Sequence, residues 1–145
     1  MKVNLENFAF DYGKVVSYPT ARVGSRSFTL DNKSGCIVRK WAIDTEVFKD
    51  RQEERCDYLI EVQGNKLIFY WIELKGKDLA KACKQVLSTI SLVNIPDKTR
   101  QEARIITTGT NKIDIRSKEY QTLYKLMLRN GGLLKQHTLQ AFEEI

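Results

Sequence analysis

The chain has 145 residues, of which 42% are hydrophobic, 29% are charged and only 2 are proline. This composition excludes collagen-like and low-complexity sequence and predicts one globular domain over residues 1–145. The formal net charge is +6, which favours an anionic partner such as nucleic acid.

The cysteines and the histidine narrow the chemistry. Cys36, Cys56 and Cys83 are an odd number and form no C-x-x-C pair, so we expect neither a disulfide framework nor a zinc ribbon, and a cytoplasmic location fits. His137 is the only histidine, which argues against a histidine pair or a Ser-His-Asp triad. The apolar runs are too short for a membrane helix or a signal peptide, so we expect a soluble protein with no membrane partner.

The first part of the chain is predicted to be rich in short strands. Residues 12–48 mix β-branched and aromatic residues with turn signals at Gly13, Pro19 and Gly24, a pattern typical of an N-terminal β-hairpin region. The last strand of this part covers residues 36–43. The charged stretch 49–55 is expected to be an exposed loop.

Residues 57–62 and 67–75 are expected to pair as a hairpin around a turn at Gly64. The second run is almost continuously apolar and aromatic, which is typical of a central strand buried on both faces. We therefore expect its aromatic residues to lie in the core; they are Phe69, Tyr70 and Trp71.

The second half of the chain alternates helices and strands. Asp78 is expected to cap a helix that ends near Asn94, and residues 104–108 predict a strand parallel to its partner because a helix intervenes. A second helix is predicted over residues 117–129, and a final strand over 133–142. The sum is an α/β domain with a mixed sheet.

A pair of charged residues falls at the end of the predicted central strand. Glu73 and Lys75 are two positions apart, so they share a face of the strand. Burial of an unpaired charge costs several kcal/mol, so this strand end must reach solvent or hold its charges in a site. The first alternative is an exposed strand end with an ion pair to Arg55 or Glu54, worth about 0–1 kcal/mol.

The second alternative is a site for metal-assisted hydrolysis of a phosphodiester. Asp57 and Glu73 would bind Mg²⁺ or Mn²⁺ through hard oxygen ligands, with the backbone carbonyl of Leu74 as a third ligand. Lys75 would orient or deprotonate the attacking water and stabilise the transition state. Gln85, on the polar side of the following helix, would hydrogen-bond a phosphate or the water.

The order of these residues resembles the motif of the PD-(D/E)XK nuclease superfamily, which includes restriction enzymes and Holliday-junction resolvases. The matching residues are Cys56-Asp57, Glu73-Leu74-Lys75 and Gln85. The resemblance covers about residues 36–109. It implies a restriction-endonuclease-like fold, in which helices flank a mixed β-sheet with an αβββαβ core, and Mg²⁺-dependent cleavage of DNA or, less often, RNA.

The chain departs from the superfamily pattern at three points. Cys56 replaces the proline of the motif, and Thr89 replaces a tyrosine found in one branch. Many members carry a further acidic residue on an opening helix, and this chain has three candidates for it, which are Glu6, Asp44 and Glu46.

The lysines near the start of the first predicted helix have two interpretations. Lysines in the first turn oppose the helix macrodipole, so contact with the phosphates of nucleic acid would explain Lys77, Lys81 and Lys84. A solvated helix face is the alternative.

The residues together predict a Mg²⁺-dependent nuclease that acts on DNA. A chain of this size covers little duplex, so cutting both strands would suit a homodimer or a larger complex. The rival prediction is a non-catalytic module or accessory subunit that keeps the fold and binds nucleic acid or protein.

The metal site places a condition on the hairpin. Residues opposite each other in an antiparallel pair share a face, and their numbers sum to a constant. A two-residue turn at Gly64 and Asn65 would place Asp57 and Glu73 on opposite faces. A three-residue loop that includes Lys66, or one bulge, would place the two carboxylates opposite each other with Cβ atoms about 5 Å apart.

Overall fold

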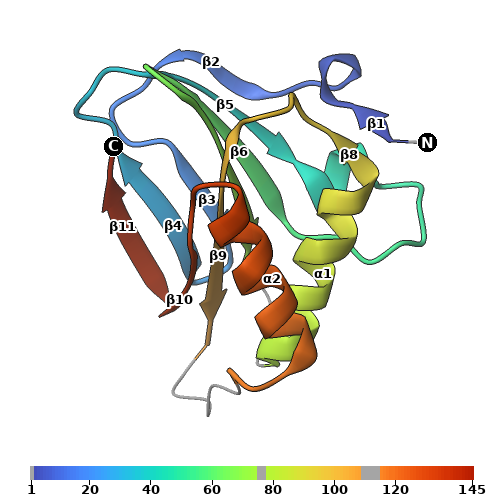
Figure 1. The fold of residues 1–145 in the computed structure, drawn as a ribbon. Coiled ribbons are helices and arrows are strands. Elements are labelled where there is room, and N and C mark those ends of the chain that lie inside the picture. The colour runs from blue at the N-terminus through green and yellow to red at the C-terminus, as the bar shows by residue number, and fades with distance from the viewer. Residues whose placement is uncertain (1, 75–77, 109–114) are drawn as a thin grey trace.

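The structure is built in three layers. The computed structural model describes residues 2–74, 78–108 and 115–145. A six-stranded mixed sheet with the order β10-β9-β7-β6-β5-β2 forms the middle layer, and a three-stranded sheet with the order β11-β4-β3 covers one of its faces. Figure 1 shows α1 and α2 together on the other face. The expected α/β class with a mixed sheet is confirmed.

The centre of the large sheet follows the predicted order of elements. The antiparallel strands β5 (Ile37–Ala42), β6 (Tyr58–Gln63) and β7 (Leu67–Glu73) are followed by helix α1 (Leu79–Leu92). Strand β9 (Arg100–Thr107) then pairs with β7 in parallel, as predicted, but begins four residues before the expected start. The strand begins earlier because Glu102 is buried in an ion pair with Arg104. A charged residue before position 104 therefore does not exclude that position from the strand.

Both predicted helices are confirmed, and so is the predicted cap of the first. The side chain of Asp78 accepts a hydrogen bond from the N–H of Lys81 at 3.1 Å and begins α1. The hydroxyl of Ser117 accepts one from the N–H of Tyr120 at 3.2 Å and begins α2 (Lys118–Arg129). No helix in the described part of the chain is long and apolar enough to span a membrane.

Strand β7 separates two apolar cores, as expected of a central strand. Phe69 and Trp71 pack with buried residues of the helices, whereas Tyr70 and Ile72 pack with the three-stranded sheet. All four side chains are at most 3% exposed. The alternation follows from the two-residue period of a strand, which sends successive side chains to opposite faces.

The arrangement of the layers differs from the prediction on one face. We expected helices to flank the sheet, but the second face is covered by β3 (Thr20–Val23), β4 (Arg26–Asp31) and β11 (Gln140–Glu144). The physical reason is that the inward side chains of this small sheet are apolar and fully or nearly fully buried against the large one; they include Ala21, Phe28, Leu30 and Ala141.

The remaining elements are short. Strand β2 (Asp11–Val15) forms one edge of the large sheet, and β1 (Val3–Asn4) pairs in parallel with β8 (Val93–Asn94). A 3₁₀ turn, η1 (Leu5–Asn7), follows β1, and a π-helical turn, η2 (Ile43–Val47), follows β5. Most side chains of the predicted loop 49–55 are exposed or partly exposed, as expected.

The predicted final strand is two strands in two different sheets. Strand β10 (Leu134–Thr138) pairs with β9, and β11 pairs with β4. Leu139 separates them with φ of 62°, and its N–H and C=O bond to Thr107 and Ser27 respectively. The weak alternation over residues 133–142 therefore reflects a change of sheet, not one continuous strand.

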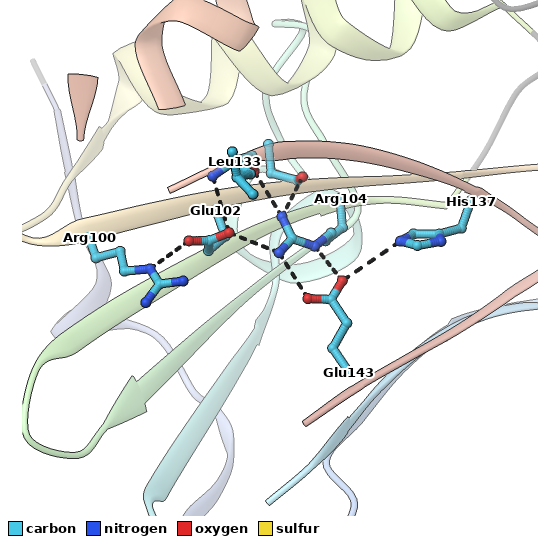
Figure 2. Close-up of polar contacts among 7 residues, drawn as sticks. Arg100, Glu102, Arg104, Leu133, His137 and Glu143 are labelled. Atoms are coloured by element: carbon cyan, nitrogen blue, oxygen red, sulfur yellow. Dashed lines mark hydrogen bonds and ion pairs between the residues drawn. The ribbon is translucent and has the colours of Figure 1, made fainter. Parts of the chain in front are cut away.

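A buried ion network joins β9 to β11 across the layers (Figure 2). Arg104 donates to Glu143 through Nε at 2.5 Å and to Glu102 through Nη2 at 2.8 Å. Glu102 also accepts from Arg100 at 2.6 Å. The network satisfies charges that neither core could otherwise hold.

Candidate functional site

The hairpin has the odd-length loop that the metal site requires. Gln63 lies opposite Leu67, so residues 64–66 form a three-residue connection. The numbers of paired residues sum to 130 throughout β6 and β7, and one further step along this register brings Asp57 opposite Glu73. The condition that the metal site places on the loop is met.

Asp57 binds the backbone at the end of the central strand. Its Oδ2 accepts a hydrogen bond from the N–H of Leu74 at 2.7 Å, and its own N–H donates to the C=O of Ile72 at 3.1 Å. The carboxylate is 4% exposed. Asp57 therefore holds the peptide that joins Glu73 to Leu74.

Glu73 is fully buried, so the interpretation of its side chain as solvent-exposed is wrong, and Lys75 lies outside the described residues. Arg55 and Glu54, the two partners that this interpretation proposed for the strand end, form ion pairs with other residues. Arg55 donates from Nε to Oδ1 of Asp44 at 2.7 Å, and Glu54 lies 3.8 Å from Nζ of Lys84.

Cys56 precedes Asp57 and is completely buried. Burial raises the pKa of its thiol, and the negative charges of Glu73 and Asp57 raise it further. The thiol is therefore neutral at physiological pH, and we assign it no nucleophilic role, because the thiolate is the reactive form.

The turn η2 brings a third carboxylate to this end of the sheet. The N–H of Ile43 donates to the C=O of Asp57 at 2.9 Å. Asp44 and Asp57 line the same small hollow of about 110 Å³, together with Val23 and Tyr58. Arg55 orients Asp44 through the hydrogen bond to its Oδ1.

Among the three candidates for a further acidic residue, Asp44 alone lines a hollow with Asp57. Glu46 is exposed on η2. Glu6 pairs with Arg39 at 2.9 Å, and Arg39 in turn pairs with Glu61 in the middle of the sheet. The hydrogen bonds from Arg39 are the main cause that lowers the pKa of Glu6, and the positive charge of Arg39 lowers it further.

Gln85 and Thr89 connect α1 to the site. Gln85 is partly buried and lines a second hollow of about 480 Å³ together with Asp44, Arg55 and Lys81. Thr89 donates from Oγ1 to the C=O of Gln85 and accepts from the N–H of Cys56, both at 2.8 Å. This hydroxyl fastens the helix to the residue before Asp57.

The predicted cationic residues are only partly described. Lys75 and Lys77 lie outside the described residues. Lys81 is exposed on α1 beside Gln85. Lys84 is 63% exposed and lies near Glu54, as noted above, so its charge is partly balanced within the chain.

The donors at this end of the sheet suit a hard cation. Asp57 and Glu73 supply carboxylate oxygens, and Leu74 supplies a backbone carbonyl, which are the ligand types that Mg²⁺ prefers. Among residues 2–74, 78–108 and 115–145, no group of three or more His, Cys, Asp or Glu side chains is arranged to hold a metal ion. The predicted set has two such side chains, so it agrees in chemistry with Mg²⁺ but depends on the backbone carbonyl.

Sequence reasoning missed two features of this region. The pairing of Arg55 with Asp44 had no local signal, because the two residues are eleven positions apart in a stretch expected to be a loop. The role of Thr89 was hidden because a threonine in a helix carries no mark of its partner. No family model, curated protein or solved structure matches this chain.

Proposed function

We propose that the chain is a PD-(D/E)XK-type nuclease that hydrolyses phosphodiester bonds of DNA with the help of Mg²⁺ or Mn²⁺. One observation carries the proposal. The carboxylate of Asp57 bonds to the peptide that follows the buried Glu73, so the acidic residues of both motif parts meet at one end of the central hairpin.

The arrangement of the central elements supports the restriction-endonuclease-like fold. Strands β5, β6 and β7, helix α1 and the parallel strand β9 follow one another as βββαβ. This order corresponds to the last five elements of the αβββαβ core that the resemblance implies. In the described chain, strands of the N-terminal region and the turn η1 stand before β5 in place of an opening helix.

Each motif residue has a distinct role in the proposed reaction. Asp57 and Glu73 would hold the cation, with the backbone carbonyl of Leu74 as the third ligand, and the hydrogen bond from the N–H of Leu74 to Asp57 fixes the peptide immediately before that carbonyl. When bound, the cation would act as a Lewis acid and would lower the pKa of a water molecule. Lys75, assigned from the sequence, orients or deprotonates that water, and Gln85 hydrogen-bonds the phosphate.

The burial of the site favours this chemistry. Asp57 and Glu73 are at most 4% exposed, and charges in a poorly solvated site interact more strongly than they do in water. A cation held between them would offset the repulsion of the two carboxylates.

Cleavage of supercoiled plasmid tests the proposal. We expect the wild-type protein to nick or linearise the plasmid with Mg²⁺ or Mn²⁺ and to be inactive with a chelator. Asp57→Asn, Glu73→Gln and Lys75→Met should each lower the rate by roughly 100-fold or more, because each removes a ligand or a transition-state contact. Asp97→Asn, an exposed carboxylate beyond α1, is the control and should cleave normally.

The results separate the nuclease from a non-catalytic module. Full cleavage by the Asp57 or Glu73 variant in a clean preparation would refute the site. DNA binding without cleavage by the wild-type protein, with either metal, would favour the binding module. An RNA duplex in the same assay decides between the two nucleic acids.

The lysines predicted to contact phosphate near the start of α1 give a second, independent measurement. If Lys77, Lys81 and Lys84 contact phosphates, changing all three to Ala should weaken binding and lower the salt dependence by about one unit per contact. Because Lys84 already lies near Glu54, we expect its share of this effect to be the smaller one. An unchanged salt dependence would identify the three lysines as a solvated face.

A further inference from the structure

The hairpin of β3 and β4 reaches the candidate site from the second sheet. Val23 lies directly opposite Arg26 across a two-residue turn. Val23 also lines the hollow that contains Asp57, and the hydroxyl of Tyr58 donates to the C=O of Arg22 at 3.2 Å. This hairpin therefore forms one wall at the Asp57 end of the large sheet.

The register of the hairpin determines which way Arg26 faces. Residues directly opposite each other in an antiparallel pair share a face, as do residues two positions apart in a strand. Arg26 thus shares a face with Val23 and with Phe28, which is fully buried between the two sheets. Arg22 is paired with Ser27 and faces the other way.

Arg26 is exceptional among the arginines that are at least partly buried. In the described chain its side chain makes no hydrogen bond or ion pair, and its Nε is buried without a partner. The other partly or fully buried arginines all pair with carboxylates; they are Arg39, Arg51, Arg55 and Arg104. A buried guanidinium donor without an acceptor lowers the stability of the fold, so its presence requires another explanation.

We propose that Arg26 binds a backbone phosphate of the nucleic-acid substrate, next to the phosphate that is cleaved at Asp57 and Glu73. The planar guanidinium presents paired N–H donors that match two phosphate oxygens. The inference rests on the proposed function, and it adds the small β-sheet to the substrate-binding surface. Nucleic acid is the fitting anion because it carries many phosphates, which can contact several basic side chains of the protein at once. A small free anion would contact Arg26 alone and would be repelled by the nearby carboxylates of Asp44 and Asp57.

Binding of a labelled 20-base-pair DNA, measured by fluorescence anisotropy without divalent metal at several salt concentrations, tests the proposal. We expect Arg26→Met to raise Kd by roughly 10-fold, the factor for one lost charge-assisted hydrogen bond. The salt dependence should fall by about one unit. Arg26→Lys keeps the charge and should bind with intermediate affinity.

Arg22→Met is the matched control. It removes the same charge from the same hairpin, but Arg22 is exposed and faces away from the large sheet, so we expect less than about a twofold change in Kd at 0.15 M salt. Thermal unfolding of each variant completes the test. Arg26→Met should unfold at or above the wild-type temperature, because it removes a buried donor that has no acceptor.

Several results would overturn the inference. These are wild-type affinity in Arg26→Met, an equal loss in Arg22→Met, and a lower unfolding temperature in Arg26→Met that Arg26→Lys restores, since the last would show a structural role. A wild-type protein that binds neither DNA nor RNA would also overturn it.

The proposed function can fail separately from the inference. If the wild-type protein cleaves nothing but Arg26→Met weakens binding as expected, the phosphate contact stands and the nuclease does not. If Asp57→Asn abolishes cleavage while Arg26→Met binds and cleaves as the wild type does, the nuclease stands and the contact does not.

Discussion

Replacement of Arg104 by methionine should be among the most damaging single changes outside the candidate site. Arg104 is 2% exposed and donates to three parts of the fold (Figure 2). Its acceptors are Glu143 on β11, Glu102 on β9 and the C=O of Leu133 before β10, at 2.5, 2.8 and 2.8 Å. Methionine has a similar length but donates no hydrogen bond.

The expected cost follows from what the change leaves behind. Glu102 is fully buried and would keep only Arg100 as its cationic partner, and Glu143 would lose both of its hydrogen bonds from Arg104. Breaking a buried ion pair from one side costs about 3–5 kcal/mol. At roughly 3 °C per kcal/mol for a chain of this size, the unfolding temperature should fall by roughly 10 °C.

Urea unfolding followed by circular dichroism measures this cost. Arg100→Met is the control, because its side chain is 45% exposed and Glu102 keeps its ion pair with Arg104, so we expect a loss of about 1 kcal/mol or less. The double variant Arg104→Met with Glu143→Leu should be more stable than the sum of the single changes, since it leaves one fewer carboxylate unpaired. A free energy of unfolding for Arg104→Met within about 1 kcal/mol of the wild type would refute the reasoning.

Three further predictions concern stability. Gly132→Ala should unfold the protein or lower its unfolding temperature severely, because the added Cβ would collide with the backbone C=O of Gln101; normal thermal unfolding would contradict this. Thr89→Val should cost about 1–3 kcal/mol in urea unfolding because it leaves the buried N–H of Cys56 without an acceptor, whereas Thr89→Ser should be close to the wild type. Burial opposes ionisation of Glu143, but the hydrogen bonds and charge of Arg104 outweigh it and lower its pKa below 4.5. The resulting stabilisation is complete above about pH 4.5 and is lost as the pH falls through the folded-state pKa, so acid titration of Glu143→Gln should show a weaker loss of stability than the wild type.

Local chemistry was sufficient to predict most of the central elements. The cap of α1 was readable because Asp78 bonds to the N–H of Lys81, three residues away, so its signal lies within one turn. The central strand was readable because its apolar and aromatic run is short and is bounded by a turn on one side and by Gly76 on the other. The hairpin register was less well determined. The sequence allowed two registers, and only the hypothesis of a metal site required the three-residue loop that the structure contains.

The surroundings of the candidate site depended on tertiary structure. Asp44 was one of three acidic candidates that the sequence could not rank, and only the position of η2 beside Asp57 distinguishes it. Arg26 gave no signal at all, because an arginine next to a turn is normally solvated. Its orientation depends on the packing of one sheet on another.

The sequence by itself therefore determined the local elements, the apolar pattern of the central strand and the motif residues Asp57 and Glu73. Tertiary structure alone decided which faces the two sheets bury, which acidic residue lines a hollow with Asp57, and which charges are buried. The physical reason is the separation along the chain between the residues that interact. Caps and strand periods depend on neighbours a few positions away, whereas the pair of Arg104 and Glu143 joins residues 39 positions apart, and a charged side chain carries the same local pattern whether it meets water or a distant partner.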